Sequence, residues 1–409
     1  MDRRIWIIFL TVFIDLLGFG ILIPILPTFA QNELAMNETL IGLTVGIFSL
    51  MQFIFNPLWG RLSDIYGRKP ILIFGLGGNV VSYIITALVL GGVLKSIPLL
   101  LISRALAGFF SANIGAAMAY ISDVTPPKDR SKGMGLIGAA FGLGFVFGPF
   151  IGGIMAKRFG YDFPTYFSAG LSAVALILTI LFVTESLPKE LRGIKSMTGL
   201  GIKSGWRKLS SALKHPHDGF LILLYFIVVF SISNIFSTFQ LYAESKDGFS
   251  FDIEQVSYLF AFSGLVGAIT QGVLIRPILK IFDERKVFIA GCVIMGIGLG
   301  TIPFSNHILA LLLVSISFMS FGNGLLLSIG LGLISKFSER DEQGGILGLT
   351  QSLASFARFI GPTWGGLVYH YISFAAPFLT GGIVMMGATI LSLRLLKDKY
   401  RHSSNTVGM

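Results

Sequence analysis

Two ionisable side chains stand inside long apolar stretches of the sequence, Asp15 in the first stretch and Arg104 in the fourth. At a helical rise of about 1.5 Å per residue, Asp15 would lie roughly 15 Å into its helix. An ionised carboxylate at that depth in an apolar medium costs several kcal/mol unless it is hydrated or paired. The position therefore predicts a group that binds and releases a proton. A structural carboxylate, hydrogen-bonded to a neighbouring side chain, is the alternative.

Other kinds of chemistry find little support in the sequence. Cys292 is the only cysteine, which excludes an internal disulfide or a cysteine-based metal cluster, and the five histidines are scattered. We therefore expect no metal site and no cofactor. No nucleophile–base set or phosphate-binding loop is recognisable, so an enzyme is the function class that the sequence favours least.

The elements that would position the two buried charges are apolar helices. Of the 409 residues, 53% are hydrophobic and 13% are charged, and the charged fraction is about half that of a soluble protein. Apolar stretches long enough to cross roughly 30 Å of hydrocarbon recur along the chain. This pattern predicts an all-α, multi-pass protein of the lipid bilayer. The first stretch begins like a signal peptide, but Asp15 and two prolines interrupt it, and we interpret it as a retained helix.

The expected spans are twelve, in two groups of six. A polar, basic linker over residues 185–217 separates an N-terminal half, 1–184, from a C-terminal half, 218–409, which ends in a short tail. The linker could form an amphipathic helix on the membrane surface or a disordered basic segment. The expected membrane-spanning helices cover residues 5–30, 40–63, 70–93, 97–121, 133–157, 162–184, 218–243, 255–280, 287–305, 307–335, 345–369 and 374–396.

The distribution of basic residues predicts the orientation of these spans. The chain carries a formal net charge of +10, and 25 of its 31 Lys and Arg residues lie in the termini and in the loops on one side of the predicted bundle. Because basic loops stay on the cytoplasmic side, we expect both termini and the turn at Gly60–Pro70 in the cytoplasm. The basic residues form no single stripe, so nucleic acid is not an expected partner.

The two halves share short sequences at nearly constant spacing, which indicates an internal repeat. GPFIGG at Gly148–Gly153 recurs as GPTWGG at Gly361–Gly366, an offset of 213 residues. SDIYGRKPILIFG, which begins at Ser63, is echoed by LKIFDERKVFIAG, which begins at Leu279. Repeated halves are common among membrane transporters. The repeat predicts a duplicated bundle of six plus six helices.

Several motifs of the chain match those of a known family. In the turn GRLSDIYGRKP, the residues that fit the loop signature G-x-L-x-D-x-x-G-R-K are Gly60, Leu62, Asp64, Gly67, Arg68 and Lys69. In the fifth span, the residues that fit the antiporter signature g-x-x-x-G-P-x-x-G-G are Gly144, Gly148, Pro149, Gly152 and Gly153. The stretches LGFGILIPILP (Leu17–Pro27) and RALAG (Arg104–Gly108) add further matches. Over its whole length the chain resembles the major facilitator superfamily, and within it the 12-span drug:proton antiporters that include tetracycline and multidrug exporters.

The resemblance implies a bundle of two pseudo-symmetric six-helix halves that exports small amphipathic compounds in exchange for protons, by alternating access. It implies that Asp15 is the proton site and that Arg104 assists proton transfer by pairing with an acid or polar group on the first span. For Arg104, a structural clamp on backbone carbonyls is the alternative. The further span acids of the tetracycline branch have no obvious counterpart here. The alternatives are a carrier or symporter of a metabolite or lipid, and a non-transporting receptor or scaffold.

The turn at Gly60–Pro70 would act as a latch on the cytoplasmic side. Gly60 would permit close contact with the opposite half. Asp64 can pair with Arg68, four residues later on a helical turn, and Arg68 could also reach Asp123 at the inner end of the fourth span. A solvated charge cluster that only sets topology is the alternative.

Between the halves we expect a mainly apolar and aromatic cavity for the exported compound. Amide side chains within the spans are candidates for its walls, because a buried amide without a partner is costly. The remaining expectations are a monomer and a location in the cell (inner) membrane. The candidate cavity residues are Phe19, Gln52, Asn113, Phe141, Asn234, Gln240, Asn323, Gln351 and Arg358.

Overall fold

The computed structural model describes residues 3–125, 130–188, 190, 192, 218–305, 307–337 and 343–396. Within these ranges, the side chains of residues 3–4, 130–139, 141, 218, 337 and 343–345 are outside the description. Nearly all of the described residues are helical, and none of them is in a β-strand. The predicted conformations of the linker fall mostly on residues 193–217, which are not among those described.

Each predicted span corresponds to one long helical segment. The segments of residues 3–182 are α1 (Arg3–Leu34), α2 (Glu38–Tyr66), α3 (Arg68–Leu90), the run of α4 (Ile97–Phe110), η1 (Ser111–Asn113) and α5 (Ile114–Val124), then α6 (Arg130–Phe159) and α7 (Phe163–Phe182). Those of residues 218–396 are α9 (Asp218–Ser233) with α10 (Thr238–Glu244), α11 (Ile253–Ile269) with η4 (Thr270–Leu274) and α12 (Ile275–Ile281), α13 (Glu284–Thr301) with η5 (Ile302–Phe304), α14 (Leu309–Phe337), α15 (Gln343–Tyr371), and α16 (Ala376–Ser392) with η6 (Leu393–Leu396).

The helices have the length and hydropathy of membrane spans. In the described part of the chain, 10 segments are long and apolar enough to cross a bilayer. The helices α6 and α15 occupy two further predicted spans and contain 30 and 29 residues. The prediction of an all-α, multi-pass membrane protein is confirmed.

Three interruptions within the spans were not predicted. A one-turn 3-10 segment joins α4 to α5, a turn over residues 234–237 joins α9 to α10, and a π-helical segment joins α11 to α12. In the π segment, the Thr270 hydroxyl donates to the carbonyl of Val266 at 2.7 Å. Hydropathy is the same on both sides of such local changes in hydrogen bonding, so it gives no signal for them.

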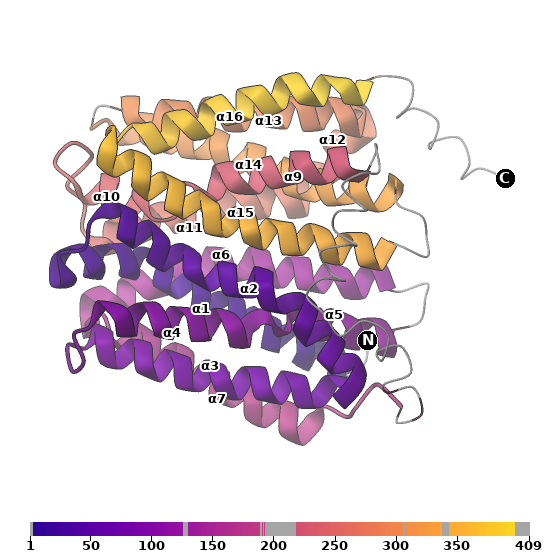
Figure 1. Ribbon diagram of the computed structural model, residues 1–409. Helices are drawn as coiled ribbons and strands as arrows, with labels where there is room; N and C mark the ends of the chain where they lie inside the picture. Colours follow the sequence, from indigo (N-terminus) through magenta and orange to yellow (C-terminus); the bar gives the residue numbers. More distant parts are fainter. Residues whose placement is uncertain are drawn as a thin grey trace.

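The helices lie roughly side by side (Figure 1). The helices of residues 3–182 form a first group and those of residues 218–396 a second group, and the two groups stack along one long boundary. The proximal end of the bundle is the end where α1 begins and α2 meets α3. The distal end is the opposite one, where α1 meets α2 and α10 meets α11. At the boundary, α2 packs against α15 and α6 packs against α11.

Glycines of α6 allow α1 to approach closely. A Cβ atom at Gly148 would stand 2.6 Å from the Cα of Gly20, and one at Gly144 would stand 2.8 Å from the Cβ of Leu16. A Cβ at Gly152 would collide with the carbonyl oxygen of Ile21. Small residues at every fourth position therefore form the seam between these two helices.

The repeated sequence GPxxGG makes equivalent contacts in the two groups of helices. Gly361 of α15 packs on α9, where a Cβ would stand 2.8 Å from the Ser233 Cβ, as Gly148 packs on α1. The last glycine of each copy instead faces the other group. A Cβ at Gly153 would collide with Ser257 of α11, and one at Gly366 would collide with the carbonyl oxygen of Glu38 of α2.

A valine at Gly153 should therefore destabilise the closed distal boundary. Overpacking typically costs about 1–3 kcal/mol, so Gly153→Val should lower the melting temperature followed by tryptophan fluorescence. Gly142→Val is the matched control on the same helix, because among the described residues no atom lies within 4 Å of a Cβ there. Equal melting temperatures for the two variants would contradict this packing.

Candidate functional site

Asp15 is enclosed by the helices of the first group. It lies on α1 with 2% of its surface exposed. The Asn79 side chain of α3 donates a hydrogen bond to Asp15 Oδ1 at 2.8 Å, and Asn79 in turn accepts one from Ser111 at 3.1 Å. The Asn113 side chain of η1 also interacts with this carboxyl group, but among the described residues Asp15 Oδ2 makes no regular hydrogen bond. One carboxylate oxygen is thus held by an amide donor, and the other is a place where a proton can be carried.

Arg104 lies in the same interior but not on Asp15. It is 1% exposed, and its guanidinium carbon lies 5.2 Å from the ring centroid of Phe48 on α2. In the described part of the chain, its Nε and Nη1 atoms have no hydrogen-bond partner. Tyr83 of α3 interacts electrostatically with both Asp15 and Arg104. The expected pairing of Arg104 with a polar group of α1 is not seen, and a cation–π contact to α2 takes its place.

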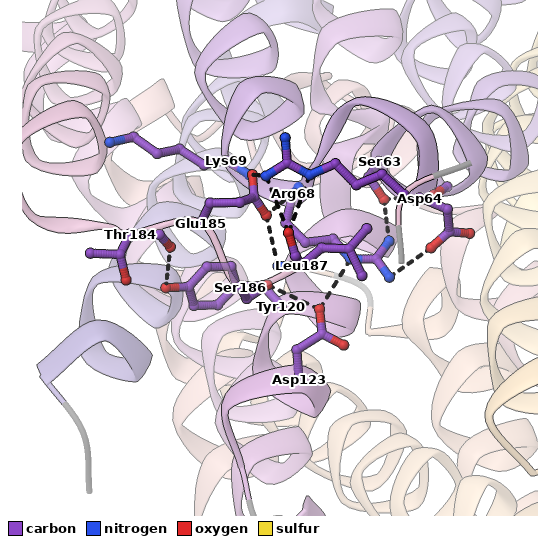
Figure 2. Close-up of polar contacts among 12 residues, drawn as sticks. Ser63, Asp64, Arg68, Lys69, Tyr120, Asp123, Thr184, Glu185, Ser186 and Leu187 are labelled. Carbon is purple, nitrogen blue, oxygen red and sulfur yellow. Dashed lines mark hydrogen bonds and ion pairs between the residues drawn. The ribbon is translucent and has the colours of Figure 1, made fainter. Parts of the chain in front are cut away.

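The charged turn between α2 and α3 is organised around Arg68 (Figure 2). Gly67 has a φ of 105°, a left-handed conformation that glycine adopts without strain. Arg68 Nη2 lies 2.6 Å from Asp64 Oδ1, and its Nε lies 3.2 Å from Asp123 Oδ2 at the end of α5. The Arg68 Nη1 atom donates to the Ser63 hydroxyl. The structure thus brings together the acid–base contacts that the turn sequence predicts.

Glu185, which sequence reasoning missed, holds the first turn of α3. Its Oε1 and Oε2 atoms accept hydrogen bonds from the backbone amides of Arg68 at 2.9 Å and Lys69 at 3.1 Å. Since Gly67 offers no side-chain cap, the amides at this helix start need another acceptor, and a carboxylate there also suits the helix dipole. The missed signal was an acid directly after the sixth span, on the same side as this helix start.

All these contacts join elements of residues 3–192. Lys69 Nζ donates to the Ile180 carbonyl at 2.8 Å, and Ser186 donates to Asp123 at 2.9 Å. No atom of the described residues lies within 4 Å of a Cβ built at Gly60, so the expected close contact of Gly60 with the opposite half is not seen. In the described part of the chain, the turn clamps α2, α3 and α5 to the segment after α7.

An aromatic row crosses the boundary between the two groups of helices. The Phe19 ring of α1 lies 4.8 Å from the ring of Phe48 and 5.8 Å from that of Phe145 on α6. The Phe145 ring in turn lies 5.8 Å from that of Phe236, in the turn between α9 and α10. Phe19 of this row is among the cavity residues predicted above.

The predicted amide residues are dispersed rather than gathered around one space. Gln52 and Asn113 are buried at the Asp15 network, where Asn113 interacts with Asp15 and Gln52 donates to the Ser111 carbonyl at 3.5 Å. Asn234 donates to the Pro377 carbonyl at 2.6 Å, and Gln240 contacts α1. Asn323, Gln351 and Arg358 are half-buried on α14 and α15, where Arg358 donates to Ser355 at 3.1 Å. The side chain of Phe141 is outside the description.

The fold and the buried charges define a multi-pass membrane protein of transporter type, and comparisons with known proteins agree. The sequence profile of the Major Facilitator Superfamily matches residues 8–280 and 221–408. Multidrug resistance protein 2 of Bacillus subtilis is 28% identical over 94% of this chain and 93% of its own length. Tetracycline resistance protein, class H, of Pasteurella multocida is 28% identical over 99% of this chain and 98% of its own length.

A solved structure shares the fold. The human organic anion transporter MFSD10 (TETRAN) superposes with a TM-score of 0.73 at 24% identity, over 95% of this chain and 99% of that one. The chain belongs to the Major Facilitator Superfamily.

Replacing Glu185 by Gln should loosen the start of α3. The neutral amide is a weaker acceptor for the amides of Arg68 and Lys69, and hydrogen bonds to charged groups contribute about 1.5–3 kcal/mol. Hydrogen exchange followed by mass spectrometry should show faster exchange in the first turn of α3. Glu190→Gln removes a nearby exposed acid and should leave that rate unchanged; equal rates in the two variants would refute the clamp.

Proposed function

We propose that this protein exports small amphipathic compounds in exchange for protons, by alternating access. Membership of the Major Facilitator Superfamily and relatives named for multidrug and tetracycline resistance support export of drug-like compounds. The observation that carries proton coupling is Asp15, a carboxylate buried in a membrane-embedded bundle with one oxygen held by Asn79 and the other making no regular hydrogen bond among the described residues.

Asp15 would load a proton from one side of the membrane and release it to the other. One proton moving through 100 mV releases about 2.3 kcal/mol, and half a pH unit adds about 0.7 kcal/mol. A hundredfold gradient of the exported compound costs about 2.7 kcal/mol. One proton per cycle is therefore enough for an uncharged compound. Arg104 would place a fixed positive charge near the site and favour release of the proton.

The conformational change would be a rocking of residues 1–184 against residues 218–409. The distal boundary is closed by the ion pair of Lys157 with Asp252 at 3.0 Å and by a hydrogen bond between His370 and Glu38 at 2.7 Å. This supports a form that is open at the proximal end. The Arg68 turn would act as a latch when the proximal end closes.

The proposed orientation places the proximal end and both termini in the cytoplasm. It rests on the excess of Lys and Arg in the loops of that end. We place the protein in the cell (inner) membrane as a monomer. The aromatic row around Phe19 and the half-buried Arg358 would face the exported compound as the halves separate.

Everted membrane vesicles test the direction and the coupling. Vesicles acidified by respiration should release protons when an exported compound is added. The Asp15→Asn variant should show uphill transport reduced at least about 100-fold, because it loses roughly 2.7 kcal/mol of driving force. Asp247→Asn, at an exposed acid of the distal end, is the control and should transport normally.

Two results would contradict the proposal. Uphill export by Asp15→Asn at the rate of the unsubstituted protein would exclude Asp15 as the coupling site. Failure to move protons with any compound of a broad panel of drugs would favour a metabolite or lipid carrier of the same fold.

A further inference from the structure

A pocket of about 610 Å³ lies at the distal end, between the two groups of helices. Its walls come from the end of α1, the connection between α6 and α7, the connection between α10 and α11, and the end of α15. It is distant from the Arg68 turn, which lies at the other end of the bundle (Figure 1). The lining residues used below are Thr28, Lys157, Tyr161, Glu244, Asp252 and Tyr369.

The charges of the pocket leave one carboxylate without a cation. Lys157 and Asp252 neutralise each other at 3.0 Å. The hydrogen bond from the Gln255 backbone, together with Lys157, lowers the pKa of Asp252 below its ordinary value, so this acid is ionised. Glu244 has no Lys or Arg within ion-pair distance among the described residues. Burial favours the protonated form of such a carboxyl while it has no cationic partner, and a bound cation would favour the ionised form.

Glu244 is held from both groups of helices as a hydrogen-bond acceptor. The Thr28 hydroxyl of α1 lies 2.9 Å from its Oε1 and 3.0 Å from its Oε2. Gln240 Nε2 donates to Oε1 at 2.7 Å. Gln240 is fully buried, and its own Oε1 atom has no partner in the described part of the chain. Acceptors thus outnumber donors at this end of the pocket, which suits a cationic ligand.

Aromatic side chains form part of the wall. Tyr161, Phe251 and Tyr369 line the pocket, and aromatic faces attract organic cations. Burial and, after it, the Glu244 carboxylate raise the pKa of Tyr161, so its hydroxyl stays neutral.

We propose that this pocket is a binding site for an organic cation with a flat apolar body, reached from outside the cell and separate from the Asp15 site. Access from outside rests on the orientation proposed above. Because the walls belong to both groups of helices, the complete pocket exists only while the distal end is closed, and a bound cation stabilises that state.

Protection of an introduced thiol tests this site. Gln31 lines the pocket at its exposed edge, and the natural Cys292 is buried. In intact cells, Gln31→Cys should react with a membrane-impermeant maleimide, and benzyltrimethylammonium, which does not cross membranes, should slow the reaction at least about threefold. Val93→Cys, exposed in a distal loop outside the pocket, should react at the same rate with and without the cation.

Substitutions in the Gln31→Cys background separate charge from general perturbation. Glu244→Gln should abolish protection, and Tyr161→Leu should weaken it while keeping the carboxylate. Glu254→Gln is the matched control, because Glu254 accepts a hydrogen bond from Tyr258 at 2.7 Å at the same end but outside the pocket lining, and it should retain protection. Unchanged melting temperatures establish that the variants are folded.

The outcomes separate this proposal from the proposed function. Absence of protection, or equal protection in Glu244→Gln and Glu254→Gln, would overturn the cation site. If Val93→Cys reacts only in everted membranes, the orientation is wrong, and the same protection assay in those membranes decides whether the site exists. Transport activity enters none of these readouts.

Discussion

A carboxylate enclosed among packed helices is the constraint on which the proposed function depends. Asp15 is buried without an ion pair among the described residues, and Asn79 satisfies only one of its oxygens. In a low-dielectric interior, an unbalanced charge is too costly to persist without a proton, a cation or water. In the proposed cycle, a helix movement that admits water from one side would change the protonation of this group and so link it to the direction of access.

In the proposed cycle, close packing of helices makes each of the two groups move as one rigid body. Glycines at equivalent positions of the repeat join α6 to α1 and α15 to α9 within each group, while Gly153 and Gly366 face the other group. Small residues at these positions let the helix backbones approach closely. The same repeated sequence thus builds both the rigid seams and the boundary that has to open.

The sequence predicts those features that a local pattern encodes. Apolar length predicted the spans, and the turn sequence predicted the contacts of Arg68 with Asp64 and Asp123. Glu185 and the Thr28–Glu244 contact were not predictable in this way, because they join residues that are 117 and 216 positions apart with no motif to mark them. The predicted pairing of Arg104 with α1 also depended on tertiary packing, which instead places its guanidinium over Phe48.

Proton release by the purified protein tests the central claim most directly. Addition of an exported compound to the protein in weakly buffered detergent solution should release up to about one proton per chain, because binding and protonation at Asp15 are linked. The Asp15→Asn variant should bind the compound and release no protons. Equal proton release from Asp15→Asn and the unsubstituted protein would contradict the account.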